Sequence, residues 1–246
     1  MVCIVLLGSP IITPSTASSN SKHLPRSALQ MRSRFSFVKQ AVNLPALQKL
    51  SVVFRRPGLL LPDLSLGSVA ELDMGRLKKE FGIRCVVFDK DNTLSLCYVD
   101  ELHESVRETV EQSKIIFGER CVAILSNSVG SCDDLDYKGA AETEQNMQLP
   151  VIRHVEKKPA CLREVLAHFE HLTPELKASE ICIVGDRVLT DVLFANLNGM
   201  LSVLVKPLSI RTDHPIAVVI RSFERWILLP FIRGFGLGRE RHKGEQ

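Results

Sequence analysis

The sequence predicts an α/β fold in which a central parallel sheet lies between two layers of helices. Short apolar runs of strand length alternate with longer stretches of helical composition. The runs consist mainly of Val, Ile, Leu and Cys without polar alternation, which is typical of parallel strands buried on both faces. The predicted strands cover residues 84–89, 121–126, 150–153, 181–186 and 201–206.

Helices are expected between these strands because apolar side chains recur there at helical spacing or the composition favours a helix. Pro159 is expected to be the first residue of its helix, a position that needs no backbone N–H. Thr190 is expected to cap a later helix, and Gly199 to end it in a left-handed conformation. The predicted helices cover residues 100–116, 133–147 and 159–169.

The first predicted strand ends in two acids, Asp89 and Asp91, with the hydroxyl of Thr93 two residues further on. The carboxyl end of a parallel strand is where α/β proteins place their active sites. A carboxylate there can attack phosphorus, and a second one just beyond it can protonate the leaving oxygen and later deprotonate water. The alternative is simple turn chemistry, because Asp and Asn favour strand exits for local hydrogen bonds.

Three later segments place further polar side chains at predicted strand ends. Ser126 and Asn127 offer a hydroxyl and backbone amides to phosphate oxygens, although a strand-end serine is commonly a turn or a cap. Lys158 precedes a predicted helix, where a lysine side chain either binds a phosphate or is only solvated. Asp186 ends the fourth strand and Asp191 follows five residues later, and two more carboxylates suit a magnesium site.

Taken in order, the segments DxDxT, a strand-end serine, Lys-Pro and GDxxxTD resemble the four motifs of the haloacid dehalogenase (HAD) superfamily of phosphohydrolases. The resemblance covers residues 84–207 and implies a Rossmann-like HAD fold, magnesium dependence and an aspartyl-phosphate intermediate. An acid at position 91 further implies that water completes the reaction. The resemblance implies that Asp89 is the nucleophile and Asp91 the general acid/base. Ser126, Asn127 and Lys158 would bind phosphate, and Lys158 would also compensate charge. Mg²⁺ would be bound by Asp89, the Asp91 carbonyl and Asp186, with Asp191 supporting the metal from outside this set.

The spacing of the motifs predicts an open site. About thirty residues separate Thr93 from Ser126, and a similar number separate Ser126 from Lys158. Each gap is filled by one helix and its loops, with a short strand in the second, so neither has room for an inserted lid domain. We therefore expect a capless fold that admits a phosphate carried on a large or anchored molecule.

The two ends of the chain differ from the middle, and we expect a leader over residues 1–50, a phosphatase domain over 51–212 and a tail over 213–246. No acid occurs before Asp63, whereas Lys, Arg and Ser are frequent, which is typical of an organelle transit peptide. Mitochondrion is favoured over plastid. The tail is basic and amphipathic, and it is either a last helix packed on the sheet or an interfacial helix with Trp226 at the lipid headgroups.

A narrower similarity, over residues 55–210, is to the mitochondrial phosphatidylglycerophosphate phosphatases. It is carried by the Arg-Arg-Pro-Gly-Leu-Leu-Leu-Pro run at 55–62, by His154, and by the motifs around Asp89, Lys158 and Asp186. The usual His after the Leu-Pro element is absent. The similarity implies dephosphorylation of phosphatidylglycerophosphate to phosphatidylglycerol, a step towards cardiolipin, on the matrix face of the inner mitochondrial membrane.

Bulk composition agrees with this interpretation without deciding it. The net charge of +3 is gathered at the chain ends and forms no stripe for nucleic acid. Seven cysteines without a Cys-x-x-Cys pair argue against a disulfide framework or a zinc site. The alternatives that stay open are a phosphatase of the same superfamily acting on a soluble sugar phosphate or nucleotide, and a non-catalytic phosphate-binding scaffold.

Overall fold

The computed structural model describes residues 50–209 and, beyond them, positions 219, 222, 224, 230 and 234. The predicted leader, apart from its last residue, and most of the predicted tail lie outside these residues. Within the described part of the chain, no helix has both the length and the apolar character needed to cross a membrane.

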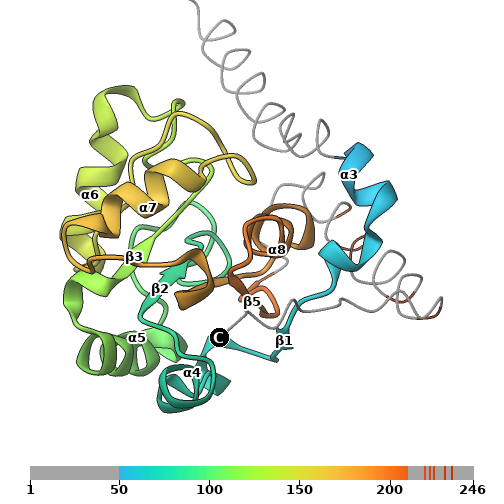
Figure 1. The fold of residues 1–246 in the computed structure, drawn as a ribbon. Coiled ribbons are helices and arrows are strands. Elements are labelled where there is room, and N and C mark those ends of the chain that lie inside the picture. The colour runs from blue at the N-terminus through green and yellow to red at the C-terminus, as the bar shows by residue number, and fades with distance from the viewer. Residues whose placement is uncertain are drawn as a thin grey trace, which may run out of the picture. The chain divides into compact units, whose positions relative to one another are not determined.

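Five parallel strands form one sheet with the order β1-β5-β4-β2-β3. β2 therefore lies inside the sheet, flanked by β4 and β3 (Figure 1). The predicted strand at 150–153 is reduced to a single parallel bridge between Val151 and Ile124, on the outer side of β3. The strands are β1 (Leu64–Ser65), β2 (Cys85–Phe88), β3 (Val122–Ile124), β4 (Ile181–Gly185) and β5 (Leu201–Leu204).

Helices cover both faces of the sheet, as the uninterrupted apolar strands predict. Phe88 of β2 and Val106 of α5 belong to one buried cluster, whereas Val87 of β2 and Phe169 of α7 belong to another on the opposite face. The predicted three-layer α/β architecture is confirmed (Figure 1). One face packs against α4 (Met74–Glu80), α5 (Glu104–Phe117) and α6 (Lys138–Met147), and the other against α7 (Leu162–Glu170) and α8 (Leu193–Leu197).

Shorter elements complete the described fold. A helix precedes β1, and six short 3-10 or π-helical turns lie between the longer elements. The first helix is α3 (Leu50–Arg55), and the turns are η1 (Pro57–Leu60), η2 (Val69–Glu71), η3 (Glu119–Cys121), η4 (Leu135–Tyr137), η5 (Ala178–Glu180) and η6 (Val188–Val192).

Three local features differ from the sequence prediction. Pro159 follows a cis peptide bond, and α7 begins further along the chain, so the expectation that Pro159 starts the helix is wrong. Thr190 lies inside η6 instead of capping a helix. β1 was not expected, because a strand of two residues gives no apolar run; Asp63 fixes it to β5 through hydrogen bonds with Ser202 of 2.9–3.1 Å. Gly199 has the expected left-handed conformation, with φ of 72°.

The connections beside the predicted site are short. Between β2 and β3 the chain forms α5 and its loops, and between β3 and Lys158 it forms η4 and α6. Within residues 50–209, neither connection contains an inserted domain, as the motif spacing predicts. The carboxyl ends of the central strands are therefore left without a lid from these two connections.

Candidate active site

Two neighbouring strands bring three of the predicted acids together. Asp89 follows β2, Asp186 follows β4, and Asp191 lies in η6 just beyond β4. Carboxylate oxygens of these three residues lie within 4.8 Å of one another, and all three side chains are buried. We call Asp89, Asp186 and Asp191 the carboxylate cluster.

Lys158 brings a positive charge into this cluster from the loop before α7. Its Nζ donates hydrogen bonds to Asp89 Oδ1 at 2.6 Å, to Asp191 Oδ1 at 2.5 Å and to the Leu125 carbonyl at 2.8 Å. Burial alone would lower the pKa of Lys158, but the Asp191 and Asp89 carboxylates together raise it above its ordinary value. The lysine therefore stays charged.

The charges of the cluster are not balanced by Lys158. Three buried carboxylates contact or surround one ammonium group, which leaves an excess of negative charge in a region of low dielectric constant. Burial raises the pKa of Asp89 to about 6, and the charge of Asp191 adds to this effect while Lys158 opposes it. A divalent cation would remove the imbalance, and carboxylate oxygens are ligands that Mg²⁺ prefers. The donor set thus fits the predicted metal.

Asp91 is held by residues outside the carboxylate cluster. Its Oδ1 lies 3.2 Å from Lys90 Nζ, and its Oδ2 accepts a hydrogen bond of 3.1 Å from Ser128 Oγ. Lys90 is 2 % exposed and also contacts Asp100 and the carbonyl of Val99, each at 3.0 Å. Both carboxylate oxygens of Asp91 are therefore held in place beside the nucleophile candidate.

The predicted phosphate-binding residues lie in the loop after β3. Ser126 is buried, and its Oγ accepts from the backbone N–H of Ser128 at 3.2 Å. The side-chain oxygen of Asn127 accepts a hydrogen bond of 2.9 Å from the backbone N–H of Lys158, which fixes the backbone of the lysine. Thr93 is buried, and within the described part of the chain its Oγ1 has no hydrogen-bond partner. Contacts of Ser126 and Asn127 with phosphate stay predictions.

His154 connects two of the site loops. Its Nε2 lies 2.8 Å from the carbonyl oxygen of Ser126, and its Nδ1 lies 2.7 Å from that of Glu156. The ring is 1 % exposed. His154 therefore holds the serine loop against the loop that carries Lys158, a role that the sequence pattern did not indicate.

Asp191 fits against the end of β4 because Gly185 has no side chain there. A Cβ atom at position 185 would lie only 2.3 Å from Cγ and Oδ2 of Asp191. Asp191 is held by Lys158 at Oδ1 and by the backbone N–H of Arg187 at Oδ2, 3.1 Å away. Because both oxygens already accept hydrogen bonds, this geometry favours an outer role beside a metal over direct binding.

Gly185→Ala is therefore expected to displace Asp191, and with it Lys158, and so to lower phosphatase turnover by at least about tenfold. The overpacking should also destabilise the fold by about 1–3 kcal/mol. Steady-state kinetics and thermal unfolding would measure the effect. Gly75→Ala in α4 is the matched control, because its Cβ approaches only one atom, Asp73 Oδ1, at 3.3 Å. Equal turnover of the two variants would contradict the prediction.

Sequence reasoning missed Glu224, which lies in the predicted tail. Its side chain is 1 % exposed, and its carboxylate accepts from the backbone N–H groups of Val188 at 2.9 Å and Leu189 at 3.3 Å. Burial raises the pKa of Glu224, while the nearby Arg187 opposes the shift. These contacts hold the start of η6, the turn that carries Asp191. Whether the tail packs on the sheet or lies at a membrane stays a prediction, because most of its residues lie outside the described part of the chain.

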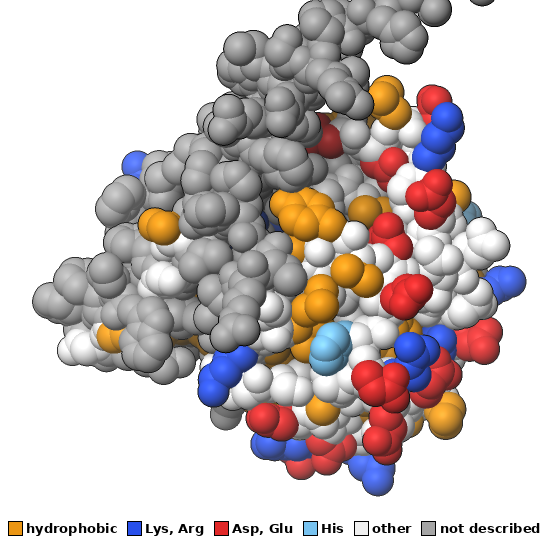
Figure 2. All heavy atoms as spheres, turned by 180° about the vertical axis from the view of Figure 1, so that it is seen from behind, with side chains coloured by type: hydrophobic (Ala, Val, Ile, Leu, Met, Phe, Trp, Pro, Cys, Tyr) orange, Lys and Arg blue, Asp and Glu red, His pale blue; other side chains and the backbone are white. Residues whose placement is uncertain are grey.

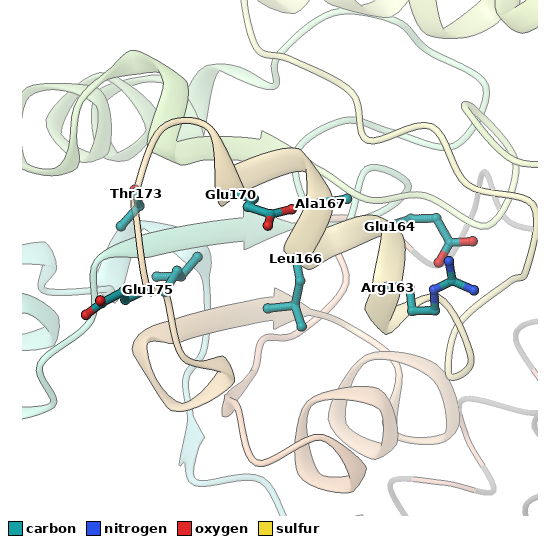
Figure 3. A pocket seen from close by; sticks show the side chains of 8 residues that line it. Arg163, Glu164, Leu166, Ala167, Glu170, Thr173 and Glu175 are labelled. Atoms are coloured by element: carbon teal, nitrogen blue, oxygen red, sulfur yellow. The ribbon is translucent and has the colours of Figure 1, made fainter.

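A surface hollow of about 630 Å³ lies beside α7 (Figure 3). It is lined by α7 side chains such as Leu166 and Glu170 and by the following turn with Thr173 and Glu175. Thr173 Oγ1 lies 3.9 Å from the thiol of Cys85, which is the first residue of β2. Asp89 follows the last residue of β2, at the opposite end of the strand. The hollow contains none of the predicted catalytic or metal-binding residues.

The fold and the site together have the arrangement expected of HAD-type phosphohydrolases. An acid follows an inner strand of a parallel sheet, a second acid lies two residues later, and the lysine and the remaining acids converge from neighbouring segments. A family model described as mitochondrial PGP phosphatase matches residues 44–208. The chain therefore belongs to the mitochondrial phosphatidylglycerophosphate (PGP) phosphatase family, which confirms the narrower similarity found in the sequence.

Curated relatives are also named as phosphatidylglycerophosphate phosphatases or phosphatidylglycerophosphatases. A phosphatidylglycerophosphate phosphatase 1, chloroplastic/mitochondrial, of Arabidopsis thaliana is 36% identical over 198 residues, which are 79% of this chain and 55% of the relative. A chloroplastic phosphatidylglycerophosphate phosphatase 1 of Chlamydomonas reinhardtii is 39% identical over 174 residues, 69% and 61% of the two chains. A probable mitochondrial phosphatidylglycerophosphatase of Schizosaccharomyces pombe is 30% identical over 167 residues, 64% and 79%.

The chain spans little more than half of the Arabidopsis relative and 61% of the algal one. No solved structure matches the chain.

Proposed function

We propose that this chain is a phosphoric monoester hydrolase that removes the terminal phosphate of phosphatidylglycerophosphate and releases phosphatidylglycerol, a step towards cardiolipin. The observation that carries the proposal is the buried carboxylate cluster around Lys158, at the carboxyl ends of β2 and β4. Family membership and the names of the relatives support the choice of substrate.

Asp89 is the proposed nucleophile. Lys158 donates to its Oδ1, which orients the carboxylate and leaves Oδ2 for attack on phosphorus. The new bond joins Asp89 to phosphorus while the bond from phosphorus to the lipid oxygen breaks. Asp91 gives that oxygen its proton, and phosphatidylglycerol leaves.

Asp91 is also the proposed base of the second step. It takes a proton from water, whose oxygen attacks the phosphorus of the aspartyl-phosphate and releases inorganic phosphate and the Asp89 carboxylate. Lys90 and Ser128 hold the two oxygens of Asp91 during both steps. Ser126 and Asn127 are the proposed donors to the phosphoryl oxygens.

The residues that would hold Mg²⁺ are Asp89, Asp186 and the backbone carbonyl of Asp91, with Asp191 outside this set. Bound there, the ion neutralises charge on the carboxylates and on the phosphate. The unbalanced negative charge of the cluster is the observation that supports the metal.

Lys90→Met is expected to impair protonation of the leaving group more than attack on phosphorus, because Lys90 holds Asp91 and not Asp89. The value of kcat/KM should fall by about tenfold to 100-fold for an alkyl phosphate, and by less than about threefold for dinitrophenyl phosphate, whose leaving group needs no proton. Lys114→Met on α5 is the control. An equal loss of kcat/KM on both substrates would show that Lys90 only stabilises the fold.

The pH dependence of activity should reflect the buried nucleophile. The pKa of Asp89 is raised to about 6, and only its ionised form attacks, so activity should fall as the pH drops below about 6. A cation bound by the cluster favours the ionised form, so the acid limb should move to lower pH at saturating Mg²⁺ than at limiting Mg²⁺. Rate profiles at the two Mg²⁺ concentrations would measure this shift. An acid limb that does not move would contradict the assignment.

The substrate is tested by comparing phosphate release from phosphatidylglycerophosphate, sugar phosphates, nucleotides and an aryl phosphate, with and without Mg²⁺. We expect the lipid to be the best substrate. If it is hydrolysed no faster than the aryl phosphate, the lipid assignment is wrong and a soluble substrate replaces it.

The proposed location is the matrix face of the inner mitochondrial membrane, with a plastid as the alternative, since relatives are named for both organelles. The proposed partner is the phospholipid surface that carries the substrate, and nucleic acid is not expected.

A further inference from the structure

Several exposed hydrophobic side chains belong to the loops that also carry the candidate site residues. The described part of the chain has six large hydrophobic residues that are exposed, and four of them lie in loops that follow the site residues. Tyr98 (63 % exposed) and Val99 (39 %) follow the Asp89 loop. Leu135 (83 %) follows the Ser126 loop, and Val155 (66 %) precedes Lys158. We call Tyr98, Val99, Leu135 and Val155 the apolar rim.

The three loops of the apolar rim are tied to one another. Ser128 donates to Asp91 at 3.1 Å, which joins the second loop to the first. Lys157 forms an ion pair with Asp133, which joins the third loop to the second. Asp100 accepts a hydrogen bond of 3.0 Å from Thr143 of α6, so the end of the first loop is anchored as well. These contacts hold the rim together at one edge of the sheet.

The backbone of two of these loops adopts a conformation that costs free energy. Tyr98 has φ of 65°, and the two residues after Leu135, Asp136 and Tyr137, have φ of 56° and 54°. Residues other than glycine adopt the left-handed region at a cost, and such strain is concentrated at functional sites. In these loops the strained backbone lies beside hydrophobic side chains that are exposed to solvent.

The charged residues beside the rim are mostly acidic, since the exposed Asp136 and Glu156 are next to Leu135 and Val155, and several of the other acids are paired. Asp133 is paired with Lys157, and Asp100 with Lys90. Asp134 accepts hydrogen bonds from three backbone N–H groups. On the face shown in Figure 2, exposed hydrophobic side chains lie among charged ones of both signs. A surface of this kind binds its partner by burying apolar area and not by electrostatic attraction.

We propose that the apolar rim inserts into the interfacial layer of the bilayer that contains the substrate. This inference rests on the proposed function, because a phosphate on a phospholipid lies at a bilayer surface and the open edge of the sheet must approach it. Aliphatic side chains and an amphipathic tyrosine are the types that enter this layer. The rim residues belong to the loops that follow Asp89 and Ser126 and precede Lys158, so insertion would bring these loops to the headgroups.

The test measures binding of the full chain to vesicles of phosphatidylcholine alone, which contain neither substrate nor anionic lipid. The triple variant Tyr98→Asn, Leu135→Ser, Val155→Ser should bind at least about tenfold more weakly than the natural chain, because three exposed side chains lose apolar area. Asn tolerates the left-handed backbone at position 98. Ile115→Ser is the matched control: it is 82 % exposed, but on α5, away from these loops, and its binding should be unchanged.

Thermal unfolding of each variant shows whether the fold is kept, and turnover separates this inference from the proposed function. The ratio of the rate on phosphatidylglycerophosphate in vesicles to the rate on an aryl phosphate should fall about tenfold in the triple variant. Binding of the triple variant equal to that of the natural chain, or an equal loss in Ile115→Ser, overturns the inference. Absence of lipid hydrolysis in the natural chain overturns the proposed function alone, because vesicle binding is measured without substrate.

Discussion

Asp89→Asn is expected to reduce phosphatase turnover by more than about 10,000-fold, as the loss of a catalytic nucleophile does in other enzymes. The fold should be retained, because Lys158 keeps its contacts with Asp191 and the Leu125 carbonyl. Replacing a buried carboxylate by a neutral amide also reduces the negative charge of the cluster. Measurement of single-turnover phosphate release and of the free energy of unfolding would check both expectations.

The matched control for this change is Asp136→Asn. Asp136 is exposed and has φ of 56°, a conformation that Asn also adopts, so this variant should keep both activity and stability. Turnover of Asp89→Asn equal to that of Asp136→Asn would rule out covalent catalysis by Asp89.

Lys158→Met is expected to impair activity and stability together. Removing one partner of a buried ion pair costs about 3–5 kcal/mol, because the remaining charges have lost their compensation. Turnover should fall by more than about 100-fold, since Asp89 loses both its orientation and its nearest positive charge. Chemical denaturation and steady-state kinetics measure the two effects.

The loss of stability in Lys158→Met should depend on pH. Without the lysine, the pKa of Asp89 rises further above its already raised value of about 6. A carboxyl group whose folded pKa is raised destabilises the fold when it is ionised, so the penalty should shrink as the pH falls from 8 to 5. Lys157→Met is the control, because that lysine pairs with the partly exposed Asp133. A similar penalty in both variants, constant with pH, would contradict the assignment.

The fold was predictable where a single segment carries the information. Four of the five apolar runs form strands of the parallel sheet, because burial on both faces requires continuous apolar sequence. The run at 150–153 was overestimated, since an apolar stretch does not reveal how many of its residues pair with a neighbour. β1 was missed because its position depends on Ser202, about 140 residues away.

The candidate site was predictable to the same extent. Asp89, Lys158, Asp186 and Asp191 follow from the motifs, and the structure brings them together. The supporting residues Lys90, Ser128 and Glu224 were not predicted, because nothing in the local sequence distinguishes a lysine, serine or glutamate that contacts the site from one that faces solvent. Their contacts arise only when distant segments meet.

Glu224 also has a thermodynamic consequence. Its carboxylate holds the first residues of η6, and η6 carries Asp191. Detachment of Glu224 from η6 and binding of a cation by the carboxylate cluster would therefore be linked equilibria. If a ligand of the tail weakens metal binding by some factor, the metal must weaken binding of that ligand by the same factor. Glu224 would thus take part in the energetics of the site without contributing an atom to the cluster.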